Sequence, residues 1–152
     1  MAAVNSVKSQ TYGASYGPGQ ARDVVCDSVV LALATTNIDN ADDDIGLLYV
    51  PKGAVIIGVA LHCTDMDSGT ALVWDIGDSA DEDRLIAAAT TGQTATSTTT
   101  LATTGFLYKY TARTQLRAYV NTAAGTPVAG TLYFAITYFV DENWDRTALA
   151  VS

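Results

Sequence analysis

Two long apolar segments limit what this chain can fold into more than any other feature of its sequence. Residues 54–63 and 131–140 are rich in β-branched or aromatic side chains, and each is apolar on both faces of an extended strand. Such strands are typical of the middle of a sheet that is covered on both sides. A further segment, 115–120, alternates between apolar and polar residues, so its even-numbered side chains are expected to face the interior.

The charged residues favour the same class of fold. Of the 16 acidic residues 14 are aspartate, and Lys and Arg together number only 8. Long helices draw on Glu, Lys and Arg, whereas strands and turns draw on Thr, Val, Asp and Gly. The chain of 152 residues is therefore predicted to be one all-β domain, an antiparallel β-sandwich or jelly roll of about eight strands. One short helix is expected at 83–89, and further strands are expected at 47–50, 71–76 and 106–110. Residues 24–33 are expected to form one long strand or two short ones.

The two ends of the sequence differ from its centre. Residues 1–20 are polar and rich in Ser, Gly and Tyr, which predicts an extended N-terminal arm before a β-sandwich domain over 21–140 and a C-terminal tail over 141–152. The arm is either a disordered terminus or a segment that orders only against a neighbour, with Tyr12 and Tyr16 as anchors. Its start lacks a basic segment followed by an apolar core, so no secretory signal is expected.

Charge and hydropathy argue against two classes of partner. The formal net charge is -8, and a protein this acidic repels nucleic acid phosphates and anionic membrane surfaces. The longest apolar run, 53–61, is less than half of the length that crosses a bilayer. We therefore expect no nucleic-acid partner and no membrane partner.

Catalytic patterns are missing from the sequence. The sole histidine, His62, ends an apolar strand, and its neighbour Cys63 points to the opposite face of that strand. His62 is therefore expected to be structural, and the chain is expected not to be an enzyme. Cys26 and Cys63 both lie in apolar runs, where they would be small buried side chains; a disulfide between them stays open.

An acidic stretch raises the question of a metal ion. Asp75, Asp78, Asp81 and Asp83 fall within nine residues, and carboxylate oxygens are the ligands that calcium requires. The spacing matches no EF-hand loop, and aspartate is common in ordinary turns. No metal or cofactor is predicted, and calcium binding by 75–83 stays open.

The strand over 131–140 has more apolar surface than one core can bury. A sandwich buries one face of each sheet, so the second face needs a helix, a loop, another subunit or another protein. Tyr133 and Phe139 lie on this second face. Together with Tyr12 and Tyr16 in the arm and Trp144 in the tail, they are the candidate partner-contact residues.

Several runs resemble one family of viral proteins. These runs are VPKGAVIIGV at 50–59, DMDSG at 65–69, WDIGD at 74–78 and DEDRLIAA at 81–88. Within a stretch of roughly 45–140, this layout resembles the jelly-roll decoration, or cement, proteins of tailed bacteriophages. The resemblance implies a non-enzymatic homotrimer on the outer surface of the virion capsid. It also implies that the partner is the major capsid protein, whose subunits it bridges and stabilises.

Two other functions stay open at the level of sequence. One is a phage tail, neck or head-fibre component, which would also be a β-rich oligomer. The other is a carbohydrate-binding β-sandwich module, in which Trp74, Trp144 and the tyrosines would stack on sugars.

Overall fold

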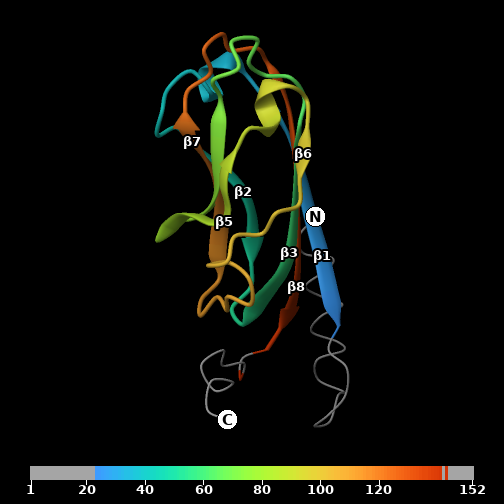
Figure 1. The fold of residues 1–152 in the computed structure, drawn as a ribbon. Helices are drawn as coiled ribbons and strands as arrows, with labels where there is room; N and C mark the ends of the chain where they lie inside the picture. Colours follow the sequence, from blue (N-terminus) through green and yellow to red (C-terminus); the bar gives the residue numbers. More distant parts are fainter. Residues whose placement is uncertain (1–22, 142, 144–152) are drawn as a thin grey trace.

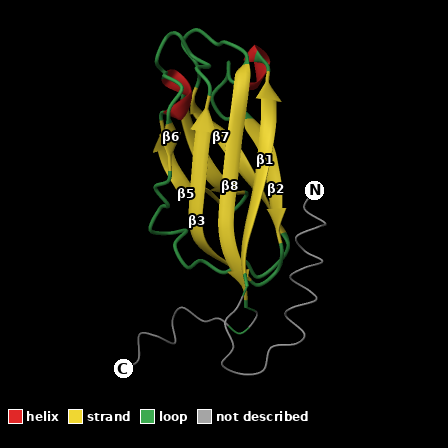
Figure 2. Cartoon of the chain, turned by 90° about the vertical axis from the view of Figure 1, so that its right-hand side faces the viewer, coloured by secondary structure: helices red, strands yellow, loops and turns green. Residues whose placement is uncertain are grey.

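Two four-stranded antiparallel sheets pack face to face in the computed structural model, which describes residues 23–141 and 143 (Figures 1 and 2). Sheet A contains, in spatial order, β1 (Val24–Leu33), β8 (Gly130–Val140), β3 (Ala54–Cys63) and β6 (Ser97–Thr98). Sheet B contains β2 (Asp44–Val50), β7 (Thr114–Thr122), β4 (Val73–Asp78) and β5 (Asp81–Ala89). Two short 3-10 turns complete the described elements, η1 (Thr35–Asn37) and η2 (Thr91–Gln93). The predicted all-β sandwich is confirmed.

The chain crosses between the sheets at almost every connection. Only the hairpin from β4 to β5 stays within one sheet, and the order β1-β8-β3-β6 facing β2-β7-β4-β5 is that of an eight-stranded jelly roll. Within the described residues, no helix is both long and apolar enough to span a bilayer.

The strand register defines two ends of the sandwich. Val24 pairs with Phe139 and Ala54 pairs with Val140, so the start of β1, the end of β8 and the start of β3 lie together. We call this the near end; it carries the 51–53 turn and the adjoining loop before β7. The turn of the β4–β5 hairpin also lies toward this end, because Gly77 pairs with Arg117 near the start of β7. The opposite end, the far end, carries the connections 34–43, 64–72, 90–96 and 123–129. Figure 1 shows the start of β1 and the end of β8 at the bottom of the molecule.

The core follows the predicted alternation. Leu116, Ala118 and Val120 of β7 are buried, as expected, and the even-numbered residues Leu132 to Tyr138 of β8 face them across the sandwich. Trp74 of β4 is the largest of the fully buried side chains. The alternation holds because each sheet presents one face to the other and one face outward.

The predicted helix at 83–89 is wrong, because this segment belongs to β5. It pairs with β4 through Trp74 and Ala89 and through Ile76 and Ile86, with irregularities between these pairs. Ala88 has a φ of 51°, which no α-helix contains. A helix of two turns is marginal by itself, so pairing along the edge of sheet B overrides the helix propensity of the alanines.

The predicted strand at 106–110 is also wrong, because it is part of an irregular segment. We call residues 99–113 the strap. Leu107 has a φ of 59°, and the strap forms only one isolated bridge, between Val55 and Lys109. It nevertheless binds both sheets: Ile56 N donates to Tyr108 O (3.0 Å) on sheet A, and Ala102 N donates to Leu85 O (2.8 Å) on sheet B. The strap therefore closes the open side of the sandwich between β3 and β5.

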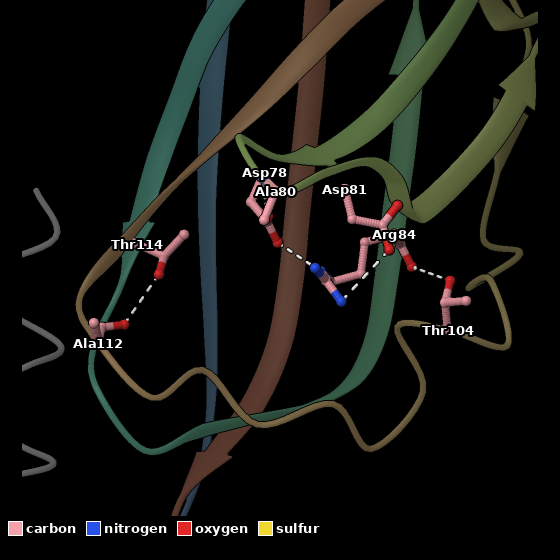
Figure 3. A network of polar contacts seen from close by, with 7 residues as sticks. All are labelled: Asp78, Ala80, Asp81, Arg84, Thr104, Ala112 and Thr114. Carbon is pink, nitrogen blue, oxygen red and sulfur yellow. Dashed lines mark hydrogen bonds and ion pairs between the residues drawn. The ribbon is translucent and has the colours of Figure 1, made fainter.

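Arg84 of β5 fastens the strap from inside (Figure 3). Its Nε donates to Asp78 (2.6 Å), its Nη1 lies 3.5 Å from Asp81, and its guanidinium lies 3.9 Å from the ring centre of Tyr108. Thr104 also donates its hydroxyl to the Arg84 carbonyl (3.1 Å). Burial alone would lower the pKa of Arg84, but the contact with Asp78 raises it, so the side chain stays a cation that joins β4, β5 and the strap.

Asp67 joins two connections at the far end. Its fully buried carboxylate accepts five backbone hydrogen bonds. Three donors precede β4 and two precede β8; they are the N–H groups of Gly69, Ala71, Leu72, Gly125 and Thr126. Burial alone would raise the pKa of Asp67, but these donors hold it well below its usual range. The ionised carboxylate thus connects 64–72 with 123–129.

Candidate interaction surface

The strands of sheet A carry no Asp, Glu, Lys or Arg on their outward side in the described part of the chain. We call this surface the sheet A outer face. It is made of alternate residues of three strands, which lie opposite one another in the register. These residues are Val24, Cys26, Ser28, Val30 and Ala32 of β1, Gly58, Ala60 and His62 of β3, and Thr131, Tyr133, Ala135, Thr137 and Phe139 of β8.

Large apolar side chains stand out from this face. Val24 is 58% exposed, Val30 is 60% exposed and Tyr133 is 41% exposed. Val30 lies directly opposite Tyr133 in the pairing of β1 with β8. The side chains of Ser28, Ala32, Ala60 and Ala135 on the same face are small, so another protein surface could approach the sheet closely there. The alternation along 131–140 predicts the β8 part of this face, whereas the β1 part depends on the strand register and has no local signal in the sequence.

The outward side of sheet B is different. It carries Asp44, Asp75 and Arg117. Arg117 forms an ion pair with Asp44, and the Asn121 amide donates to Asp75. Charges that are already paired with each other and with water are costly to bury in an interface. The contrast between the two sheets therefore identifies the sheet A outer face as the better surface for a protein partner.

The predicted contact residues fall into two groups. Tyr133 and Phe139 both lie on the sheet A outer face, where Tyr133 is exposed and Phe139 is half-buried. Tyr12, Tyr16 and Trp144 lie outside the described residues. The contact role of all five remains a prediction.

His62 lies on the sheet A outer face and has structural partners. Its Nδ1 lies 2.9 Å from the Ser97 hydroxyl and 3.1 Å from the Thr96 carbonyl, and its ring centre lies 5.5 Å from that of Tyr133. These contacts attach the short β6 to the edge of β3. Cys63, its sequence neighbour, is buried on the opposite face of the strand. The His62 imidazole and the Cys63 thiol therefore lie on opposite faces of β3 and do not meet.

The cysteines differ from one another in their surroundings. Cys63 is buried as expected, and burial raises the pKa of its thiol to about 11. Cys26 is exposed on the sheet A outer face, which corrects the expectation that both are buried. The edge strand β1 turns every second residue outward, and Cys26 is one of these. The two side chains point to opposite faces of sheet A, so no disulfide joins them.

The acidic stretch 75–83 forms most of the β4–β5 hairpin, with Ser79 and Ala80 as its turn. The Asp75 carboxylate accepts from Ala88 N (2.7 Å), and Asp78 accepts from Ala80 N (2.9 Å) and from Arg84. Both carboxylates are thus used within the protein. In the described part of the chain, no three His, Cys, Asp or Glu side chains gather as a metal site requires.

Trp74 does not offer a platform for a sugar. It is fully buried in the core, so its indole cannot stack on a ligand from solvent. Of the two tryptophans that the carbohydrate-binding alternative requires, Trp74 is therefore not available to a sugar.

Comparison with known proteins points to viral shells. No protein-family model matches the chain, and no curated protein matches it in sequence. Solved phage capsids do contain similar chains. A chain of the cyanophage Pam1 capsid asymmetric unit aligns with a TM-score of 0.70 and 27% identity, over 83% of this chain and 92% of that chain.

Two further capsids contain chains with this fold. One is the capsid of Ralstonia phage GP4, with a TM-score of 0.66 and 24% identity over 83% of this chain and 90% of that chain. The other is the acidic stable capsid of Helicobacter pylori bacteriophage KHP30, with a TM-score of 0.56 and 14% identity over 79% and 90% of the two chains. The likeness to the cyanophage chain, in sequence as well as in fold, supports a structural role in a phage virion.

Proposed function

We propose that this chain is a non-enzymatic virion structural protein that decorates a phage capsid. In this proposal it lies on the outer surface of the shell as a homotrimer, where it bridges subunits of the major capsid protein and stabilises them against internal pressure. The observation that carries the proposal is the uncharged sheet A outer face, with its exposed Val24, Val30 and Tyr133, in a chain whose net charge is -8. The likeness to chains of phage capsids supports it.

The size of this face suits an assembly of many weak contacts. Three strands of about ten residues, about 4.8 Å apart and rising about 3.4 Å per residue, cover on the order of 500 Å². A stable pairwise interface buries about 800 Å² per partner, so this face alone supports a modest contact. When one subunit of a trimer is bound to a shell, the other two are held at a high effective concentration near their own sites. The overall binding is therefore stronger than that of a single contact. In a trimer the contact is heterologous, so this face meets a different surface of the next copy.

The test is selective binding to heads. Purified protein is mixed with mature heads of its phage that lack the protein, with isolated tails and with duplex DNA, and the bound fraction is measured by sedimentation. We expect saturable binding to heads alone and slower rupture of the decorated heads on heating. Saturable binding to tails but not to heads would instead assign the chain to the tail or neck.

A further inference from the structure

The strand β1 forms a long and regular edge of sheet A (Figure 2). All ten of its residues pair with β8, and the pairing has no register shift. Thr64, which follows β3, donates its N–H to the Thr131 carbonyl (3.0 Å), so the backbone groups of odd-numbered residues in β8 point toward β3. Those of even-numbered residues in β8 point toward β1, where their partners are odd-numbered. The N–H and C=O groups of the even-numbered residues of β1 therefore point away from β8.

The other three sheet edges are interrupted or covered. The pairing of β2 with β7 shifts register between Gly46 and Tyr49. The pairing of β5 with β4 also shifts, and the strap bonds to the other side of β5, where Ala102 N donates to Leu85 O. On the last edge, β6 has only two residues, and the strap bonds to β3 beside it. Proteins block sheet edges in such ways to prevent pairing with other chains, so the uninterrupted edge of β1 is the best site for an added strand.

An added strand would also cover side chains that β1 leaves half-buried. Val25, Val29 and Leu31 pack against the core but stay partly exposed, because β1 is the last described strand on this side of sheet A. Asp27 is the one charged residue of β1; its carboxylate accepts from Ser28 N (2.9 Å). Like charges on neighbouring strands are unfavourable, so the edge favours a strand without acidic residues.

The chain itself contains a segment with suitable charge and length. The 22 residues before Asp23 include Lys8 and Arg22 and no acidic residue, so they carry a charge of +2 and leave -10 on the rest of a chain whose total is -8. Fully extended, this segment reaches about 75 Å, about twice the length of a ten-residue strand. It contains no proline before Pro18, so its first 17 residues can all donate to a sheet.

We infer that the edge of β1 receives residues 1–22 of a neighbouring copy as an additional strand of sheet A. This inference rests on the homotrimer of the proposed function and names a contact that joins its subunits. A three-fold axis brings together two different surfaces of each copy, so β1 cannot pair with the β1 of a neighbour and needs another segment. Around the ring each copy donates one segment and receives one. The backbone hydrogen bonds give affinity, and the opposite charges of segment and body favour the encounter.

The test blocks this pairing from each side in the full-length chain. Ala32→Pro removes an N–H group that points away from β8, and Ala32→Ser is the matched control that keeps it. Val7→Pro combined with Thr11→Pro removes two N–H groups from the donated segment. Its control, Val7→Thr combined with Thr11→Val, exchanges the two side chains and keeps both groups. Light scattering measures the oligomer mass, and hydrogen exchange with mass spectrometry measures the protection of the β1 amides.

We expect wild-type protein and both controls to have the mass of three chains and slow exchange at 24–33. The proline variants should have the mass of one chain and exchange at least about tenfold faster in this segment, because its outward amides lose their acceptors. If Ala32→Pro does not fold, the double variant decides, since it leaves the sequence of the sandwich unchanged.

Two results would overturn the inference. One is a mass of three chains with slow exchange in the double proline variant. The other is slow exchange in wild-type monomers obtained by dilution, which would mean that each copy pairs its own segment with β1. Binding to heads is measured separately: a wild-type trimer with protected β1 amides that does not bind heads would overturn the proposed function and leave the strand exchange standing.

Discussion

At the scale of single residues, the clearest prediction about stability concerns Asp67. The Asp67 carboxylate accepts hydrogen bonds from five backbone N–H groups. Asp67→Asn replaces one carboxylate oxygen with an NH₂ group, which is itself a donor and faces some of these N–H groups. We expect a loss of about 3 kcal/mol in the free energy of unfolding, because buried donors lose a charged acceptor. Urea denaturation measures it. Asp65→Asn, at an exposed position, is the control and should change the free energy by under about 0.5 kcal/mol.

The lowered pKa of Asp67 predicts that the stability of the protein depends on pH. The pKa of Asp67 is lowered in the folded protein, so its contribution is complete above the unfolded value of about 3.9 and is lost as the pH falls below it. Wild-type protein should therefore lose stability between about pH 4 and pH 2 more steeply than Asp67→Asn. Parallel curves for the two proteins in this range would contradict the assignment.

At the scale of elements, Arg84 should matter more than any surface ion pair. Arg84→Met leaves the buried Asp78 carboxylate without its cation and removes the contact with Tyr108, so we expect a loss of about 3 kcal/mol. Arg117→Met removes an exposed ion pair with Asp44 and should cost less than about 1 kcal/mol. Guanidinium denaturation of both variants checks this, and equal losses would mean that Arg84 does not fasten the strap.

Deletion of residues 1–20 tests the role of the arm. Since the arm has no apolar period to bury in a core, the deletion should leave the thermal midpoint nearly unchanged and weaken binding to heads. Differential scanning calorimetry and the sedimentation assay measure the two effects. A truncated chain that fails to fold would show that the arm is part of the core.

Local patterns predicted some elements well and missed others for physical reasons. The alternation at 115–120 and the apolar faces of 131–140 are properties of single strands, and both were correct. The alanines at 87–89 favour a helix locally, but pairing with β4 decides the outcome. Asp67 lies in a predicted turn, yet two of its donors are about 60 residues away in the sequence, so no local signal indicates them.

The candidate surface shows the same limit. Tyr133 and Phe139 were found because alternation places them on the second face of one strand. Val24 and Val30 join them only through the register of β1 against β8, which the sequence does not encode locally. The charge contrast between the two outer faces is likewise a property of the assembled sheets.

At the scale of the whole molecule, the sheet A outer face should control self-association. Val30→Glu places a charge at an exposed position of this face, where burial against a neighbour becomes costly. We expect light scattering to change from the mass of three chains to that of one, with the thermal midpoint of the monomer fold retained. Gln115→Glu adds the same charge to the outward side of sheet B and should leave the mass of three chains intact.

The central claim is that this protein coats the outside of a phage shell, and a cryo-EM reconstruction of the virion tests it most directly. We expect density for the jelly roll on the outer capsid surface, as a trimer that contacts at least two subunits of the major capsid protein. Absence of this density from the head, together with its presence in the tail or neck, would contradict this claim.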